Sequence, residues 1–217
     1  NQIAPLFREH GIVPGDTIAI FAENSPRYFE IAWAAQRSGL YYVCISSRLT
    51  APEVEYILSD SGARIVIASA GLSSVASEVN ATTKLDAYWS IDGEIFGYQK
   101  LEDIRAGKPV TPIADEMMGT DMLYSSGTTG RPKGIRPPLE QGIAIDEPSV
   151  LVQLAQVLAK AQGDDMVYLS PAPLYHAAPL RWCMSFTRMG ATLIIMEKFD
   201  PEKYLQLVET YKVTHTQ

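Results

Sequence analysis

The stretch Ser125-Ser126-Gly127-Thr128-Thr129-Gly130-Arg131-Pro132-Lys133-Gly134 decides more about this chain than any other segment. Its glycines allow the backbone to approach an anion closely. Consecutive exposed amide groups form a concave anion site, to which the Ser and Thr hydroxyls add hydrogen-bond donors. Lys133 supplies the positive charge that a polyphosphate requires. The apolar run Met122-Leu123-Tyr124 directly before the stretch indicates a buried strand that leads into a loop. We therefore predict a phosphate-binding loop at residues 125–134.

The loop does not follow the Walker pattern, which places Ser or Thr directly after Gly-Lys and opens into a helix. Here Lys133 stands between Pro132 and Gly134, and Pro137-Pro138 prevent a continuous helix soon afterwards. A flexible Ser/Gly/Thr linker is the structural alternative, but such linkers rarely end in Pro-Lys-Gly behind an apolar strand. The residues alone therefore indicate a polyphosphate site that works without a helix N-terminus.

Composition limits the classes of protein to which the chain can belong. With 217 residues, of which 47% are hydrophobic, it is long enough for one domain with a sizeable core. Its formal net charge of −7 argues against nucleic acid or an anionic membrane as a partner. No apolar run is long enough to span a bilayer, and no signal-peptide pattern is present. Cys44 and Cys183 stand far apart in apolar surroundings, which is typical of buried thiols in a cytoplasmic protein.

Strand and helix signals alternate along the chain. Apolar runs predict strands at residues 17–22, 41–45, 64–68, 87–91, 122–124, 166–169, 191–196 and 213–216. Helical periodicity and start signals (Ser25, a Thr50–Glu53 capping box and Asp200-Pro201) predict helices at residues 1–10, 26–38, 51–59, 72–79, 149–162, 180–189 and 201–211. Residues 93–121 and 135–148 are the least periodic and are expected to be irregular connections. We predict an α/β fold of layered, mostly parallel sheets with flanking helices.

Residues 124–134 closely resemble the signature loop of the adenylate-forming superfamily, which includes acyl-CoA synthetases, luciferases and peptide-synthetase adenylation domains. The shared pattern is an aromatic residue, a small hydroxyl residue, Ser-Gly-Thr-Thr-Gly, any residue, and Pro-Lys-Gly. The resemblance implies that the loop holds the β- and γ-phosphates of ATP and that AMP is transferred to a carboxylate. It implies phosphate contacts from Ser125, Ser126, Gly127, Thr128, Thr129, Gly130 and Lys133. Thr128 would also enter the shell of a Mg²⁺ ion that arrives with ATP.

A second resemblance concerns Pro173-Leu174-Tyr175-His176, which is similar to the Pro-Leu-aromatic-His run of acyl- and aryl-CoA ligases. Peptide-synthetase adenylation domains show Phe-Asp-x-Ser at the equivalent place. The resemblance implies CoA as a second substrate and His176 as a catalytic residue between the acyl pocket and the reacting phosphate. From the residues alone, a lone His in an apolar run is more often a satisfied structural histidine. One stretch departs from the pattern: Arg136-Pro137-Pro138 stand where relatives have an apolar pair and begin a helix.

The resemblance covers nearly the whole chain and implies that residues 1–217 are a truncated portion of the N-terminal AMP-binding domain, with the C-terminal domain absent. The implied function of the intact protein is that of an AMP-forming acyl-CoA ligase of fatty acid metabolism. Its substrates would be ATP, a carboxylic acid and CoA, and the chain alone is expected to be inactive. Two alternatives remain, namely an amino-acid adenylation module that loads a carrier protein and a non-catalytic nucleotide-binding relative.

Overall fold

The computed structural model describes residues 1–125, 131–139, 142–147 and 149–217. The chain divides into two compact units. The first unit comprises Asn1–Glu23 and Arg27–Ile145. The second comprises Asn24–Pro26 and Asp146–Gln217. Each unit has its own sheet and its own helices.

The first unit is built on a seven-stranded sheet with the order β5-β4-β3-β1-β2-β6-β7. All of its neighbouring pairs are parallel except β6 and β7, which are antiparallel. The strand bounds are β1 Thr17–Phe21, β2 Tyr41–Ile45, β3 Ala63–Ser69, β4 Ala87–Ile91, β5 Gln99–Lys100, β6 Thr120–Tyr124 and β7 Gly134–Ile135. Strands β1 and β2 are buried at every position, because helices cover both faces of a parallel sheet.

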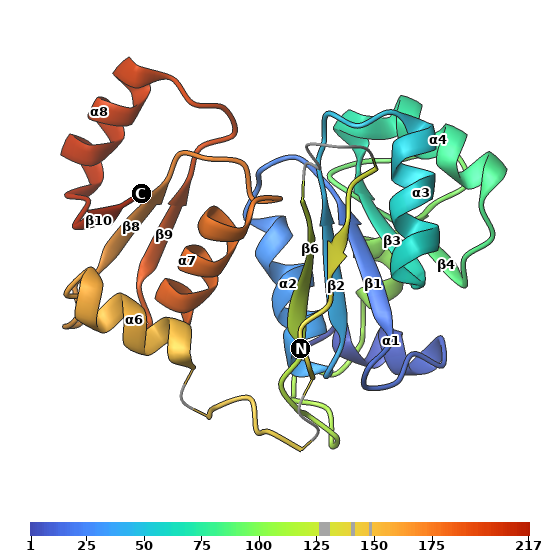
Figure 1. Cartoon of the computed structure of the whole chain (residues 1–217), viewed down its shortest axis with the longest axis horizontal. Coiled ribbons are helices and arrows are strands. Elements are labelled where there is room, and N and C mark those ends of the chain that lie inside the picture. The colour runs from blue at the N-terminus through green and yellow to red at the C-terminus, as the bar shows by residue number, and fades with distance from the viewer. Residues whose placement is uncertain (126–130, 140–141, 148) are drawn as a thin grey trace. The chain divides into compact units, whose positions relative to one another are not determined.

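Helices lie on both faces of this sheet, and their bounds are α1 Ala4–Glu9, α2 Arg27–Arg37, α3 Ala51–Ser61, α4 Ser73–Thr82 and α5 Leu101–Arg105, with a short 3₁₀ helix at Ala70–Leu72. One face is covered by α3 and α4, whose Val54 and Val79 share a buried cluster with Val43 of β2 and Val66 of β3 (Figure 1). On the other face, the ring of Phe7 from α1 stacks on fully buried Trp89 of β4.

The start of α3 is fixed by the predicted capping box. The Glu53 carboxylate accepts hydrogen bonds from the Thr50 backbone N–H at 2.8 Å and from the Thr50 hydroxyl at 2.7 Å. The bond from the Thr50 backbone, followed by the bond from its hydroxyl, lowers the pKa of Glu53. At the other end, Gly62 adopts a left-handed conformation with φ of 67° and ends the helix.

The second unit has a parallel three-stranded sheet with the order β10-β8-β9. Its strands are β8 Val167–Ser170, β9 Thr192–Ile195 and β10 His215–Thr216, and its helices are α6 Val150–Leu158, α7 Ala177–Arg188 and α8 Pro201–Tyr211. Figure 1 shows α8 on one side of the sheet and α6 and α7 on the other. The small core of this unit centres on Tyr168 and Phe186, whose ring centroids are 4.3 Å apart.

The mostly parallel α/β architecture predicted from the sequence is confirmed, and Cys44 and Cys183 are buried as expected. Burial raises the pKa of each thiol to about 12, so both remain protonated at neutral pH. No helix among the described residues is long and apolar enough to cross a membrane.

Several element boundaries differ from the prediction. Helix α6 ends at Leu158 rather than at residue 162, because Lys160 takes a positive φ of 51° that an α-helix does not accommodate. Helix α7 begins three residues earlier than predicted, at Ala177, directly after extended His176. The region 93–121, expected to be irregular, contains β5 and α5.

The predicted cap of α2 is wrong. The Ser25 side-chain oxygen is buried and has no hydrogen-bond partner among the described residues, so it does not cap the helix that begins at Arg27. Residues 135–148 were also expected to be irregular, yet Ile135 belongs to β7. That strand has only two residues and exists through its pairing with β6, a long-range contact that no local pattern announces.

Candidate active site

The predicted phosphate loop joins the two antiparallel strands β6 and β7 of the first unit. Leu123 pairs with Ile135, and Tyr124 pairs with Gly134. Beyond these pairs, the Ser125 backbone N–H donates to the Lys133 carbonyl at 3.0 Å, and the Ser125 hydroxyl lies 3.4 Å from the same carbonyl. Ser125 and Lys133 therefore face each other across the mouth of the loop.

Five of the predicted phosphate ligands lie outside the described residues, and they are Ser126, Gly127, Thr128, Thr129 and Gly130. The predicted Mg²⁺ contact of Thr128 is one of them. The described ends of the loop, Ser125 and Lys133, are both exposed and not helical, as the sequence predicts. The Lys133 ammonium has no hydrogen bond or ion pair with any described residue. Its charge is therefore not neutralised by the described part of the chain.

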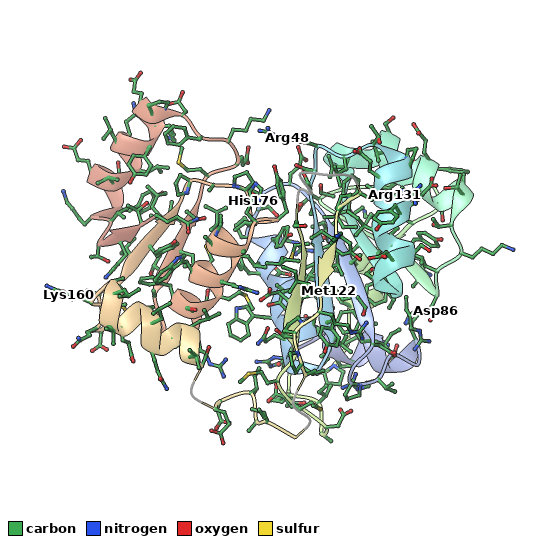
Figure 2. The ribbon with its side chains drawn as sticks, viewed as in Figure 1. Arg48, Asp86, Met122, Arg131, Lys160 and His176 are labelled. Carbon is green, nitrogen blue, oxygen red and sulfur yellow. The ribbon has the colours of Figure 1, made fainter. Side chains whose placement is uncertain are left out.

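Gly134 brings the return strand close to the ring of Tyr124. A Cβ atom at Gly134 would lie 2.7 Å from Met122 Cε and 2.8 Å from Tyr124 Cζ, so a larger residue would push both side chains away. The Tyr124 hydroxyl in turn donates to the Asp60 carboxylate of α3 at 2.6 Å. Burial, followed by this bond to Asp60, raises the pKa of Tyr124, and the hydroxyl stays a donor. Met122, labelled in Figure 2, belongs to β6.

His176 belongs to the second unit and occupies the N-cap position of α7 (Figure 2). Its backbone N–H donates to the Pro173 carbonyl, and its carbonyl accepts from the Leu180 N–H, both at 3.2 Å. The imidazole is exposed and lies against the ring of Tyr175, with 4.5 Å between the centroids. The ring does not cap the helix. The catalytic role of His176 stays a prediction.

Sequence reasoning missed Asn24, which holds the segment that precedes His176. Within the second unit, the Asn24 side-chain amide donates to the carbonyls of Ala172 and Met196, both at 3.0 Å. Its side-chain oxygen accepts from the Leu174 N–H at 2.9 Å. These three bonds tie the turn before α7 to the end of β9. Because the bonded partners are 148 to 172 residues away in sequence, no local pattern could have revealed them.

A cleft of about 220 Å³ lies between α6 and α7 in the second unit. Its walls are mainly apolar and are formed by Leu151, Leu154, Ala177, Ala178, Arg181, Trp182 and Ser185. Two of these residues, Ala177 and Ala178, directly follow His176 in the chain. The second unit therefore places an apolar concavity beside the start of α7, where His176 occupies the N-cap position.

Comparison with known proteins gives consistent matches over the whole chain. Residues 1–217 match the family model described as AMP-binding enzyme. The chain is 32% identical over 216 residues to long-chain-fatty-acid–CoA ligase FadD13 of Mycobacterium tuberculosis. This match covers 98% of the chain and 41% of that protein. It is 31% identical over 219 residues to feruloyl-CoA synthase of Amycolatopsis sp, and the match covers 98% of this chain and 40% of that protein. The chain thus spans about two fifths of the length of these curated relatives.

Solved structures show the same fold. The N-terminal domain of FACL13 from Mycobacterium tuberculosis superposes with a TM-score of 0.78 at 28% identity, covering 98% of this chain and 52% of that one. The amide bond synthetase McbA from Marinactinospora thermotolerans has a TM-score of 0.82 at 22% identity, covering 99% of this chain and 42% of that one. At that identity, the second similarity concerns the fold alone.

Proposed function

The chain belongs to the AMP-binding enzyme family, and we propose that residues 1–217 are a portion of the N-terminal AMP-binding domain of an AMP-forming acyl-CoA ligase. In the proposed reaction, a carboxylate oxygen attacks the α-phosphorus of ATP and pyrophosphate leaves, which produces acyl-AMP. The thiol of CoA then attacks the acyl carbon and AMP leaves. The remaining groups of the active site would come from residues outside 1–217, so the chain alone would not catalyse the reaction.

The observation that carries this proposal is the placement of Lys133. Its exposed ammonium has no partner among the described residues and stands at the mouth of a hairpin loop rich in Ser, Thr and Gly. A polyphosphate fits this sequence, because Lys133 supplies a cation and the Ser, Thr and Gly residues of the loop are types that supply hydroxyl and backbone amide donors. Lys133 would bind the β- and γ-phosphates together with Ser125 and the Ser126–Gly130 segment. Mg²⁺ would arrive with ATP, with Thr128 in its shell.

An apolar acid is the proposed acyl donor. The segment after His176 continues with Ala177, Ala178, Pro179 and Leu180, and its first two residues line the apolar cleft between α6 and α7. We propose that His176 contacts the reacting carboxylate or phosphate, since its ring is exposed at the start of α7. The proposed location of the protein is the cytoplasm.

The two alternatives are less well supported. An amino-acid substrate carries an ammonium group, which a site normally pairs with a carboxylate. Residues 173–180 contain no Asp or Glu. Loss of Lys133 or Gly130 would favour a non-catalytic nucleotide-binding relative, and this chain retains both residues.

The substrate class can be tested by measuring AMP release from the full-length protein with MgATP and two sets of acids. We expect release with apolar fatty or aryl acids, and acyl-CoA formation when CoA is added, because the proposed acyl site offers apolar walls and no carboxylate for an ammonium group. Amino acids should give only background release. The matched assay replaces CoA by a carrier protein. Release that requires an amino acid and a carrier protein, and does not respond to CoA, would favour the adenylation-module alternative.

A further inference from the structure

Two Arg-Pro pairs flank β7, and each is held by one tyrosine of the first unit. At the first pair, the Tyr56 hydroxyl of α3 donates to the Pro132 carbonyl at 3.1 Å. The guanidinium carbon of Arg131 lies 5.2 Å from the centroid of the same ring. One tyrosine therefore holds both the side chain of the arginine and the main chain of the proline that follows it.

The second pair repeats this arrangement on the other side of β7. The Tyr41 hydroxyl of β2 donates to the Pro137 carbonyl at 2.7 Å, and the guanidinium carbon of Arg136 lies 4.1 Å from the centroid of the Tyr41 ring. The Arg136 guanidinium also donates to the Gly15 carbonyl at 2.9 Å. Tyr41 is only 6% exposed, so its position is set by the core of the unit.

Each tyrosine makes one contact with its aromatic ring and another with its hydroxyl. The ring face attracts the arginine cation, and the hydroxyl satisfies a carbonyl. Proline fixes its own φ and restricts the backbone of the residue before it, so an Arg-Pro pair presents both groups from a stiff backbone. We call these two sets of contacts the Tyr56 clasp (Tyr56, Arg131, Pro132) and the Tyr41 clasp (Tyr41, Arg136, Pro137). Together they hold the two ends of the segment that contains Lys133 and β7.

We propose that Tyr56 and Tyr41 are positioning residues that fix the returning strand of the phosphate loop and thereby the location of Lys133. The proposal depends on the proposed function in one respect only, namely that the ligand of Lys133 is the polyphosphate of ATP. The other strand of the hairpin is held from the same helix as the Tyr56 clasp, because Asp60 lies one turn after Tyr56 on α3 and accepts the Tyr124 hydroxyl bond. The Tyr41 clasp uses Arg136-Pro137, where this chain departs from the helix start that its sequence resemblance implies.

Limited digestion with trypsin tests the clasps without any ligand. Trypsin cuts after Lys or Arg unless proline follows, so within residues 131–138 only the Lys133–Gly134 bond is cleavable. We expect Tyr56→Phe and Tyr41→Phe, in the full-length protein, each to speed cleavage at this bond about fivefold, the effect of one ordinary hydrogen bond on local opening. Arg131→Gln should act in the same direction, because it removes the cation and leaves the hydroxyl bond.

Tyr98→Phe is the matched control. The Tyr98 hydroxyl also donates to a backbone carbonyl, that of Ala76 at 3.0 Å, and its ring packs on Tyr88. This variant should leave cleavage at Lys133–Gly134 unchanged. Thermal melting of all variants separates local from global effects, and the clasp variants should melt close to the wild type. Cleavage rates in Tyr56→Phe and Tyr41→Phe equal to that of Tyr98→Phe would overturn the proposal, as would faster cleavage that merely follows a lowered melting temperature.

Repeating the digestion with MgATP distinguishes the clasps from the proposed function. In the wild type we expect MgATP to slow cleavage at Lys133–Gly134, and in the clasp variants we expect the KM for ATP to rise about fivefold with an unchanged KM for the acid. Faster cleavage in the variants without protection by MgATP in the wild type would support the clasps and contradict nucleotide binding. Protection by MgATP in the wild type, with no effect of the variants on cleavage, would support nucleotide binding and contradict the clasps.

Discussion

Lys133→Ala should lower kcat/KM for MgATP of the full-length protein about 10- to 150-fold, the loss that follows from removing one charged hydrogen bond of about 1.5–3 kcal/mol. The ammonium is exposed and has no bond to any described residue, so its removal should leave the fold intact. The loss should therefore appear in catalysis and nucleotide binding and not in the melting temperature. Initial rates at varied ATP concentration, with the acid and CoA held at saturation, measure it.

The control for this substitution is Lys84→Ala, which removes another exposed lysine of the same unit at a position outside the loop. Both variants change the net charge equally, so any general electrostatic effect on ATP binding is shared. Lys84→Ala should behave as the wild type. Full activity of Lys133→Ala with unchanged dependence on ATP would remove Lys133 from the site, whereas equal losses in both variants would indicate a charge effect without a specific contact.

Gly119→Ala should lower the free energy of unfolding by about 3 kcal/mol or more, at the upper end of the range for overpacked sites. A Cβ atom at Gly119 would meet backbone atoms of Leu40 and Ala35, with the Leu40 nitrogen 2.7 Å and the Ala35 oxygen 2.9 Å away. Backbone atoms cannot rotate aside as a side chain can. The substitution would therefore push the start of β6 away from β2, and β6 leads into the phosphate loop.

Gly71→Ala is the matched control for this prediction. Its added Cβ would also overlap an existing atom, but that atom belongs to the side-chain carboxylate of Glu23, which can turn into solvent. The free energy of unfolding should decrease by less than about 1 kcal/mol. Urea unfolding followed by tryptophan fluorescence compares the two variants with the wild type. A Gly119→Ala protein as stable as Gly71→Ala would show that β6 can shift without cost and that the close approach at Gly119 is not required.

Much of the fold follows from local signals in the sequence. The strands at residues 41–45 and 87–91 have the predicted bounds, because each is a short, mainly apolar run. Helix α8 begins at Pro201 as predicted, and the Asp200 side chain accepts from the Lys203 N–H at 2.7 Å. The errors fall where tertiary contacts decide, as in two-residue β7 and in α6, which stops before Lys160.

The position of the candidate loop and its exposure were predictable from the sequence. The pattern of Ser, Thr, Gly and Lys predicted an exposed loop at a strand end, and the exposure of Ser125 and Lys133 confirms this for the described residues. The residues that hold the loop were not predictable. Tyr56 and Tyr41 meet their proline partners across 76 and 96 residues of sequence, and Tyr and Arg have no preferred spacing for such contacts. Neither residue carries a pattern that separates it from an ordinary core aromatic residue.

Exchange of labelled pyrophosphate into ATP tests the central claim most directly. The full-length protein is incubated with MgATP, labelled pyrophosphate and an apolar carboxylic acid, without CoA. We expect label to enter ATP only when the acid is present, because formation of acyl-AMP releases pyrophosphate and is reversible. Lys133→Ala should slow this exchange and Lys84→Ala should not. Formation of ADP and inorganic phosphate, with no label entering ATP for any acid, would contradict the assignment of an AMP-forming ligase.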